Sequence, residues 1–415
     1  MMMKLDWRLG VVVFGVTIGQ AHAQSSVTLY GLIDEGLMYT NSVQTSSTPG
    51  AHNGKSQVAL VDGASGIGGS RWGITGTEDL GGGLKTLFTL ENGFNINNGT
   101  LGQGGLMFGR QAFIGLSAPV GTVTIGRQYN TVTDFVFSTS VAGLVPGHLG
   151  AHPDDIDDAG HSQRINNTIK FKSATFDGIT VGGMYGLGGV AGNFTQKQFW
   201  SGAVSYVAGP LTVAAGYTDA RNPNLSYFGT GGTSGPATSN NMGSIGSATE
   251  AASNPVYSGF SSARSLRIAE GGARYQIGAG TVGAMFSHVS FSNLGDTTSG
   301  PNPLGYSGSA IFNDFEINGG YTFGAAFQVA AAYNYLHGAS VTGSGGATGG
   351  VTYHQGLLSA AYFLSKRTEL YAIAIYQKAT GRDSLNQPAV ASITGVSPSA
   401  TDHQAVVRLG ILHRF

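Results

Sequence analysis

Hydrophobic and polar residues alternate along much of the chain with a period of two, which is typical of β-strands. In the stretch "AIFNDFEINGGYTF" the residues Phe315, Ile317 and Tyr321 share one parity, whereas Asp314 and Glu316 share the other. One face of such a strand suits lipid and the opposite face suits water. Helical periodicity is scarce by comparison, so the pattern predicts an all-β protein.

Stretches rich in Gly, Thr, Tyr, Phe and Val recur along the chain, and Gly-containing turns separate them. We expect sixteen strands, over residues 27–40, 66–77, 84–95, 106–118, 121–129, 164–174, 178–187, 197–207, 211–219, 264–276, 281–292, 310–323, 326–337, 351–363, 368–378 and 403–415.

The connections between these strands differ in length in a regular way. Short turns such as "AGP" and "LSKR" alternate with long linkers at 130–163, 220–263, 293–309, 338–350 and 379–402. An even number of antiparallel strands, with tight turns on one side and long loops on the other, is typical of a bacterial transmembrane β-barrel. Closure of the barrel satisfies every backbone hydrogen-bonding group, as hydrocarbon requires. A large soluble β-sandwich or propeller would show a repeat period or more even loops.

The composition indicates that something other than water covers part of the surface. Charged residues make up 10% of the chain, against about 25% in ordinary soluble domains. The formal net charge is −1, which suggests neither nucleic acid nor an anionic membrane surface as a partner. Cysteine is absent from the sequence, so disulfides and thiol chemistry are excluded.

The first residues have the pattern of a secretory signal peptide. Lys4 and Arg8 precede the apolar run "LGVVVFGVTIG", and Ala21 and Ala23 have the spacing that a signal peptidase reads. The run is too short for a membrane-spanning helix, which needs about 20 residues. We therefore expect a signal peptide over residues 1–23 and a single barrel domain over residues 24–415.

Five segments carry a resemblance to a known family. They are "SSVTLYGLIDEGLMY", "SRWGITGTEDLGGGLKTLFTLENGF", "FGRQAFIGLSAPVGTVTIGRQY", "RINNTIKFKS" and the final "LGILHRF". Together, and in this order, they resemble the general-diffusion porins of Gram-negative outer membranes. The long outer loops, especially 220–263, show no recognisable motif.

The resemblance implies a transmembrane antiparallel barrel of about sixteen strands, with short periplasmic turns, long outer loops and a third loop that folds inward. It also implies a multi-pass protein of the cell outer membrane, surrounded by outer-membrane lipid and lipopolysaccharide. A homotrimer with contacts through the first and last strands would accommodate Glu35, whose parity otherwise turns its carboxylate toward lipid. Each subunit would pass small hydrophilic solutes and ions passively, without a cofactor.

Porins of this family have a constriction in which basic wall residues face acidic residues on the third loop. By position in the matching segments, the basic candidates are Arg71, Arg110, Arg164 and Arg127. The third outer loop spans residues 130–163, and its acidic candidates are Asp134, Asp154, Asp155, Asp157 and Asp158. Opposed charges across a narrow water channel would make a transverse field that orients dipolar solutes. Alternatively, the arginines pair within the wall and "DDIDD" is a solvated loop tip.

Strand alternation agrees with the basic candidates. Phe113 opposes Arg110, and Ile165 and Ile169 oppose Arg164, so the arginines would face water while the apolar residues face lipid.

The last strand carries a second candidate function. In "VRLGILHRF" the residues Val407, Leu409, Ile411 and Phe415 share one face, which we expect to meet lipid. Among porins, a terminal aromatic residue with apolar residues at alternate positions is the signal that the outer-membrane assembly machinery reads. The resemblance therefore implies an assembly signal at Phe415, Ile411 and Leu409.

Other chemistry has little support. "DDIDDAG", with His148, His152 and His161 nearby, could bind calcium, but it lacks the complete ligand set of an EF-hand. We expect no metal. A barrel enzyme would need a nucleophile and a base near one another, and no "GxSxG" elbow or comparable context is present. A nonspecific porin and a solute-specific channel with a saturable site stay open as alternatives.

Overall fold

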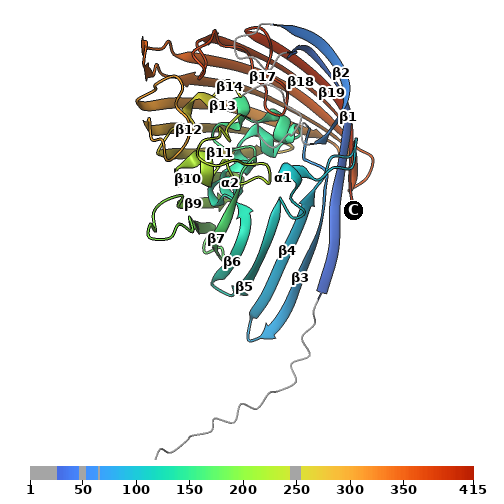
Figure 1. The fold of residues 1–415 in the computed structure, drawn as a ribbon. Helices are drawn as coiled ribbons and strands as arrows, with labels where there is room; N and C mark the ends of the chain where they lie inside the picture. Colours follow the sequence, from blue (N-terminus) through green and yellow to red (C-terminus); the bar gives the residue numbers. More distant parts are fainter. Residues whose placement is uncertain (1–25, 46–52, 64–65, 244–253) are drawn as a thin grey trace, which may run out of the picture.

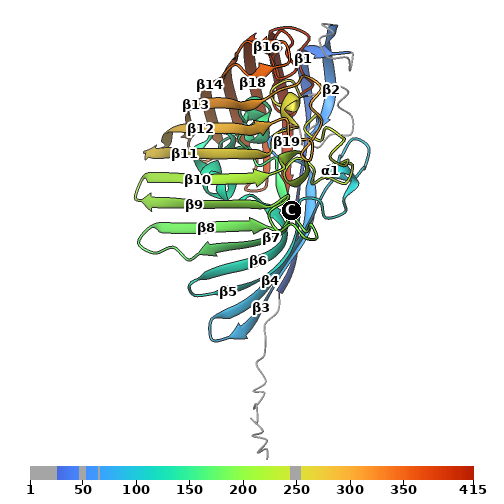
Figure 2. The ribbon, with the colours of Figure 1, turned by 60° about the vertical axis from the view of Figure 1, so that its left-hand side comes forward.

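The computed structural model describes residues 26–45, 53–63, 66–243 and 254–415, and the expected signal peptide at 1–23 lies outside them. Figures 1 and 2 show an antiparallel barrel in which each strand lies beside the next. The first strands are β1 (Ser26–Gln44), β2 (Gly54–Asp62), β3 (Arg71–Gly81), β4 (Leu84–Gly93), β5 (Gln111–Ala118), β6 (Gly121–Tyr129), β7 (Arg164–Ser173), β8 (Ile179–Gly186), β9 (Phe199–Ala208) and β10 (Leu211–Arg221). The others are β11 (Ser265–Ile277), β12 (Gly280–Leu294), β13 (Gly308–Phe323), β14 (Phe327–Gly338), β15 (Thr342–Gly343), β16 (Gly346–Ala347), β17 (Val351–Phe363), β18 (Thr368–Gly381) and β19 (His403–Arg414).

Helices are few and short. They are α1 (Gly102–Gly105), α2 (Thr131–Val136) and α3 (Pro223–Ser226), with short 3-10 turns mainly in the loop between β6 and β7. Within the described ranges, no helix is long and apolar enough to cross a membrane.

The main sheet contains 17 strands, but the wall is sixteen strands around, because β2 and β3 follow one another along the same edge of β1. The first part of β1 pairs with β3, and its second part pairs with β2. The opposite edge of β1 pairs with β19, from Leu32 beside Arg414 to Thr40 beside Val406. This pairing closes the sheet, so the predicted all-β barrel of sixteen strands is confirmed.

The predicted strand at 66–77 is the one that differs most. The structure has strand residues at 54–62 and 71–81 instead, and the chain leaves the ladder between them. There the N–H groups of Ile67 and Gly68 donate to the carboxylate of Asp34, at 2.9 and 3.2 Å. At Gly66 a Cβ would lie 2.8 Å from both this carboxylate and the guanidinium of Arg408. The Gly-rich segment therefore wraps a buried charge and does not continue the strand.

The two faces of the strands have the expected character. In β13, Phe315, Ile317 and Tyr321 are 53%, 65% and 45% exposed, whereas Asp314 and Glu316 are 1% and 2% exposed. The apolar residues of β13 thus lie on the outer wall, and its acidic residues lie inside the barrel, where loops cover them.

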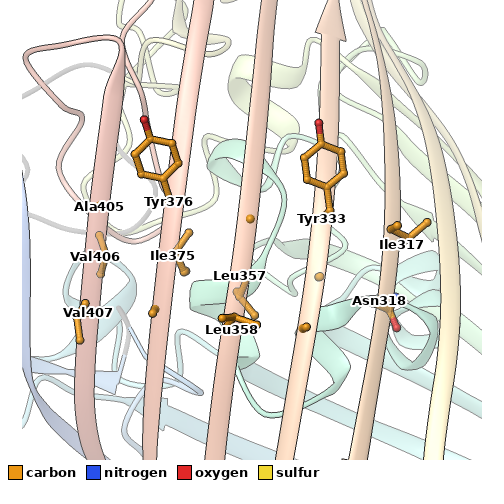
Figure 3. Close-up of a pocket in the computed structure, with 14 residues that line it drawn as sticks. Ile317, Asn318, Tyr333, Leu357, Leu358, Ile375, Tyr376, Ala405, Val406 and Val407 are labelled. Atoms are coloured by element: carbon orange, nitrogen blue, oxygen red, sulfur yellow. The ribbon is translucent and has the colours of Figure 1, made fainter.

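The outer face is hollowed over β13 to β19 by a groove of about 750 Å³. Tyr333 and Tyr376 both pair with Gly356, one from each neighbouring strand. Figure 3 shows the two tyrosines on either side of β17, with Leu358 between their strands. Leu358 is 66% exposed, so this hollow belongs to the outer wall and not to the lumen.

The outer half of the lumen is partly filled by loops. A buried apolar cluster joins inward side chains of the wall, such as Leu266 and Phe312, to loop residues such as Tyr257 and Phe260. The same cluster contains Ile156 of the loop 130–163 and Ile165 of β7. The arginines expected to line the pore lie elsewhere, on β3, β6 and β7 and just before β5.

Candidate functional site

Three of the predicted arginines gather around two side chains, Glu91 of β4 and Tyr129 of β6. Arg110 and Arg164 donate from Nη2 to the hydroxyl of Tyr129, at 2.7 and 3.0 Å. Nε of Arg110 also donates to Glu91, at 2.9 Å, and Nε of Arg71 lies 3.8 Å from the same carboxylate. A single acid thus partners two guanidinium groups, and the cluster carries excess positive charge.

Aromatic groups hold this basic cluster in place. The guanidinium carbons of Arg110 and Arg164 lie 5.9 and 4.7 Å from the centre of the Tyr129 ring. Tyr30 of β1 donates to the second oxygen of Glu91, at 2.9 Å. Because a guanidinium over an aromatic face is attracted by the ring quadrupole, Tyr129 can order two like charges side by side.

Arg127, the fourth candidate, lies beside this cluster and has other partners. Its Nε donates to the carbonyl of Gly109 at 2.8 Å, and its Nη1 donates to the carbonyl of Thr230 in an outer loop at 2.9 Å. The structure therefore brings Arg71, Arg110 and Arg164 together and assigns Arg127 a contact between wall and loop.

Two of the apolar residues expected to face lipid opposite these arginines, Phe113 and Ile165, do not lie on the lipid face. In β5 the outward residues are Ile114 and Leu116, 60% and 52% exposed, so Phe113 has the opposite parity and does not share their face. Arg110 precedes β5, so the strand does not set its direction. In β7, Asn167 is left-handed at φ 56° and the register shifts, which leaves Ile165 buried at 1% exposure while Ile169 is 46% exposed.

The loop 130–163 folds into the barrel, as the resemblance implied, and Figure 1 shows it in teal inside the wall. Helix α2 packs against β8 to β11 through small residues. A Cβ at Gly216 would come within 2.5 Å of Val132, and one at Gly182 within 2.8 Å of Phe135. Glycine at these wall positions lets the helix approach the strands closely.

Asp134 is the loop acid that reaches the basic side. Its carboxylate contacts Lys170 of β7, and Nε2 of His161 lies 3.5 Å from it. The His161 ring in turn lies against Tyr129, with centroids 5.1 Å apart. Burial raises the pKa of Asp134, but Lys170 and His161 lower it by more, so its net pKa lies below the ordinary value. Asp134 is therefore an ionised acid beside the arginine cluster.

The other four loop aspartates were expected to face the arginines. The structure buries them within the loop instead. Asp154, Asp155, Asp157 and Asp158 are at most 6% exposed. Asp155 and Asp158 accept backbone N–H groups of Gly160 and Gln163, at 2.6 and 2.8 Å. The backbone explains this placement, because Asp154, Asp155 and Asp158 have φ of 50° to 65°, and Asp tolerates this region when its side chain forms local hydrogen bonds.

These buried aspartates also fix the loop to its surroundings. Asp154 accepts a hydrogen bond from Ser392 of the last outer loop at 2.8 Å, and Asp157 accepts one from Ser287 of β12 at 2.6 Å. Among the described residues, no group of three or more His, Cys, Asp or Glu is arranged to hold a metal ion.

His152 attaches the loop to the wall through an ion pair with β13. Its Nδ1 lies 2.7 Å from Asp157, its Nε2 lies 3.2 Å from Glu316, and Asp314 is 3.6 Å away. Burial lowers the pKa of His152, but Asp157 and Asp314 raise it by more, so the net pKa lies well above the ordinary value. A protonated imidazole thus bridges loop and β13 in a site that is at most 2% exposed.

Several of these residues were missed by sequence reasoning. Tyr129 and Glu91 stand in the segments "GRQY" and "TLENGF" that carried the resemblance, but neither was singled out. His152 was considered only as a metal ligand. A signal did exist for Glu91, because an acid on the polar face of a strand needs a cationic partner.

Comparisons with known proteins agree with this geometry. The family model described as Gram-negative porin matches residues 10–382. The chain belongs to the Gram-negative porin family.

One relative is an outer membrane porin protein of Bordetella pertussis, 34% identical over 220 residues; the match covers 48% of this chain and 55% of that protein. The chain thus spans about half the length of this curated relative. Two solved structures are similar in fold. An anion-selective porin from Comamonas acidovorans has a TM-score of 0.66 at 22% identity, covering 94% of this chain and 100% of that one. The trimer form of OmpT from Vibrio cholerae has a TM-score of 0.61 at 15% identity, covering 94% and 99%. This porin is accordingly a β-barrel of the outer membrane.

Proposed function

We propose that this porin forms a water-filled channel through which small hydrophilic solutes and ions diffuse passively. One observation carries the proposal: inside a closed barrel, the Arg71, Arg110 and Arg164 cluster adjoins the inward-folded loop that bears ionised Asp134. Opposed charges of this kind order water and orient dipolar solutes, whereas an apolar solute must displace that water. Such passage needs no cofactor and no reaction, so the proposal is transport and not catalysis.

The charge balance supports a preference for anions. Among the described residues, Glu91 is the acid that forms ion pairs with the wall cluster, and the charge of Asp134 is matched by Lys170. The arginine charge is therefore not cancelled, and it lowers the energy of an anion in the narrow section relative to a cation. The similar porin from Comamonas acidovorans is anion-selective, but the residues of this chain are what support the proposal.

We further propose how the protein is exported to the outer membrane and assembles there. Residues 1–23 act as a signal peptide, the assembly machinery inserts the barrel beside lipopolysaccharide, and three copies associate. The outward side of β1 supports a subunit contact, because Leu29, Leu37 and Tyr39 are 61%, 49% and 43% exposed there. The folded protein should therefore migrate as an SDS-resistant trimer that heat dissociates.

Planar-bilayer recording of the folded protein tests the channel. We expect stepwise conductance, a reversal potential of anion-preferring sign in a salt gradient, and swelling of liposomes that declines with sugar size. Saturation and block by one solute class would favour the solute-specific alternative. Folded trimer that gives no channel events would contradict both.

A further inference from the structure

Four polar side chains form a row across β4 to β7, close to the short turns of the barrel. The strand pairing places Lys85 beside Ser117, Ser117 beside Thr122, and Thr122 beside Lys172. Residues that lie directly opposite one another in antiparallel strands point to the same face of the sheet. The four side chains therefore share one face, and we call them the periplasmic row.

The periplasmic row faces the inside of the barrel. The ammonium of Lys172 lies 5.6 Å from the centre of the Phe135 ring, and Phe135 belongs to helix α2 of the inward-folded loop. On the same strands, Leu116 and Phe171 are 52% and 39% exposed on the outer wall, as strand alternation requires. The row thus lines the lumen and not the lipid-facing wall.

The row is separated from the arginine cluster along the strands. Tyr129 ends β6, and Thr122 stands beside the first residue of that strand. At about 3.3 Å per residue, these two residues are about 23 Å apart along the chain. Lys170 lies between the two levels, where its ammonium donates to the carbonyl of Tyr129 at 3.0 Å and pairs with Asp134. The charge of Lys170 is therefore already matched before the row is reached.

The two lysines of the row carry unmatched charge. Neither makes an ion pair with an acid of the described chain. Asp79 of β3 stands beside Lys85 in the ladder, but its carboxylate accepts the N–H of Gly81 in the turn, at 2.9 Å. Three strand spacings of about 4.8 Å separate the two lysines, and flexible four-carbon stems can bring both ammonium groups to the hydroxyls between them.

The hydroxyls at the centre of the row can donate to a ligand. Oγ1 of Thr122 donates to Oγ of Ser117 at 2.9 Å, which leaves the O–H of Ser117 without an acceptor among the described residues. An oxyanion between the lysines would accept from this hydroxyl and from both ammonium groups. Such charge-assisted hydrogen bonds are about twice as strong as neutral ones.

We propose that the periplasmic row is a second anion-binding site of the channel, which binds the oxyanion groups of small solutes after they have passed the arginine cluster. A solute must bind and also leave, and several sites in series permit both. An anion with two charges is favoured over chloride, because it meets both ammonium groups at once. The inference rests on the proposed channel function and adds to it a site at the exit.

A cysteine reporter tests binding without any measurement of current. The chain contains no cysteine, so Leu87→Cys introduces a single thiol on the lumenal face of β4, two residues from Lys85. The folded full-length protein in detergent is modified with an anionic or a cationic methanethiosulfonate, and mass spectrometry gives the two rates. We expect the anionic reagent to react faster. Inorganic phosphate should abolish this preference at concentrations where chloride of equal ionic strength does not.

Variants of the row are made in the reporter protein. Lys85→Gln/Lys172→Gln should lower the ratio of anionic to cationic rates at least about fivefold at low salt, and should remove the effect of phosphate. Lys85→Arg/Lys172→Arg keeps the charges and should keep the ratio. The matched control is Lys366→Gln/Arg367→Gln, which removes two charges from the turn between β17 and β18 and should change neither result. Heat-modifiable mobility on gels shows that each variant is folded.

Equal effects of phosphate and chloride on the reporter, or equal ratios in the row and control variants, would overturn the proposal. Bilayer recording separates the site from the channel function. Phosphate on the periplasmic side should block the chloride current of the parent at a lower concentration than that of Lys85→Gln/Lys172→Gln. A folded parent that gives no current but keeps the phosphate effect would contradict the channel and support the site. Current that phosphate blocks equally in both proteins would support the channel and contradict the site.

Discussion

The guanidinium of Arg408 in the last strand lies 3.3 Å from the carboxylate of Asp34 in the first strand, and both side chains are fully buried. Nε of Arg408 donates to the hydroxyl of Tyr371 at 2.7 Å, and that hydroxyl donates to Asp34. The N–H groups of Ile67 and Gly68 complete the shell of the carboxylate. This cluster joins β1, β18, β19 and the segment between β2 and β3 at the place where the barrel closes.

Replacing Arg408 by Met should weaken the closed barrel. Removal of one member of a buried ion pair leaves the other charge uncompensated, which costs about 3–5 kcal/mol. We expect a lower midpoint in heat-modifiability gels of the purified protein. Arg414→Gln is the control, because Arg414 pairs with Glu369 in the neighbouring strand but is 46% exposed, and such pairs are worth about 1 kcal/mol or less. Similar midpoints for both variants would contradict a closing role for the buried pair.

The junction between β1 and β19, where the barrel closes, also includes a feature of the fold that could not be predicted from the sequence. Alternation and loop lengths predicted sixteen strands and the outward face of β13, since both follow from local spacing. The interruption at 66–70 was not predictable, because it depends on a contact between Asp34 and Arg408, which are 374 positions apart. A strand pattern carries no information about such a distant charge.

In the candidate site, likewise, some residues could be predicted from the sequence and others could not. Arg71, Arg110 and Arg164 were found because they stand in segments shared with a family. The individual aspartates could not be placed from the sequence, because "DDIDD" fits both a pore lining and a solvated loop tip, whereas the structure buries Asp154, Asp155 and Asp158 with a left-handed backbone. Local sequence cannot tell whether a carboxylate bonds its own loop or faces water.

Substitution at the arginine cluster should change ion selectivity with opposite signs on its two sides. Arg164→Ser removes a positive charge and should shift the reversal potential toward cations, whereas Asp134→Asn should shift it toward anions. A unit charge acting over 4 Å in water is worth about 1 kcal/mol, which is roughly a fivefold change in permeability ratio. Bilayer recording in a salt gradient measures both variants.

Arg267→Ser serves as the control for this experiment, since Arg267 faces outward and is paired with Asp219. It should keep the parent's conductance and reversal potential. If Arg164→Ser and Asp134→Asn also keep the parent's conductance and reversal potential, the cluster does not line the narrow section of the channel. This result would not contradict the barrel fold.

Alkaline pH should loosen the loop at His152. The pKa of His152 is raised in the folded protein, since Asp157 and Asp314 outweigh the effect of burial. Stabilisation from a raised pKa is fully present below the unfolded pKa of about 6.5 and is lost as pH rises through the folded pKa. Asp158 acts in the same direction, because burial and Asp155 raise its pKa well above the ordinary value. We expect more frequent closures in bilayer recordings and faster proteolysis within 130–163 as pH rises from neutral.

His152→Gln should show this loosened behaviour at neutral pH, because the carboxylates of Asp157 and Glu316 then lack a cation, and it should lose the part of the pH dependence that comes from His152 while the part from Asp158 stays. The loss of loop anchoring should be about 3–5 kcal/mol. His403→Gln is the control, since His403 is exposed and pairs only with neighbouring Asp402 among the described acids. An unchanged alkaline transition in His152→Gln would show that another group controls the loop.

Phe415 has two separable roles at the end of the last strand. Its N–H and carbonyl pair with Gly31 of β1, at 3.0 and 3.1 Å, and its ring occupies the space where a Cβ of Gly31 would fall, at 2.4 Å. Leu409, Ile411 and Phe415 all lie on the outer wall, 57%, 46% and 42% exposed. The residue therefore closes the backbone ladder and also presents an aromatic ring on the outward face.

Two variants separate these roles, because Phe415→Ser keeps the backbone pairing and removes the ring, whereas deletion of Phe415 removes both. If the ring is the assembly signal, both variants should slow insertion in cells by a similar factor, measured as the fraction of heat-modifiable trimer after a pulse of synthesis. Only the deletion should also lower the stability of protein that has folded, by about 1 kcal/mol for each lost hydrogen bond. His413→Ser changes the same outward face without removing an aromatic end, so it should insert at the parent rate. Normal insertion of Phe415→Ser, with a defect confined to the deletion, would mean that the residue matters for closing the barrel and not as a signal.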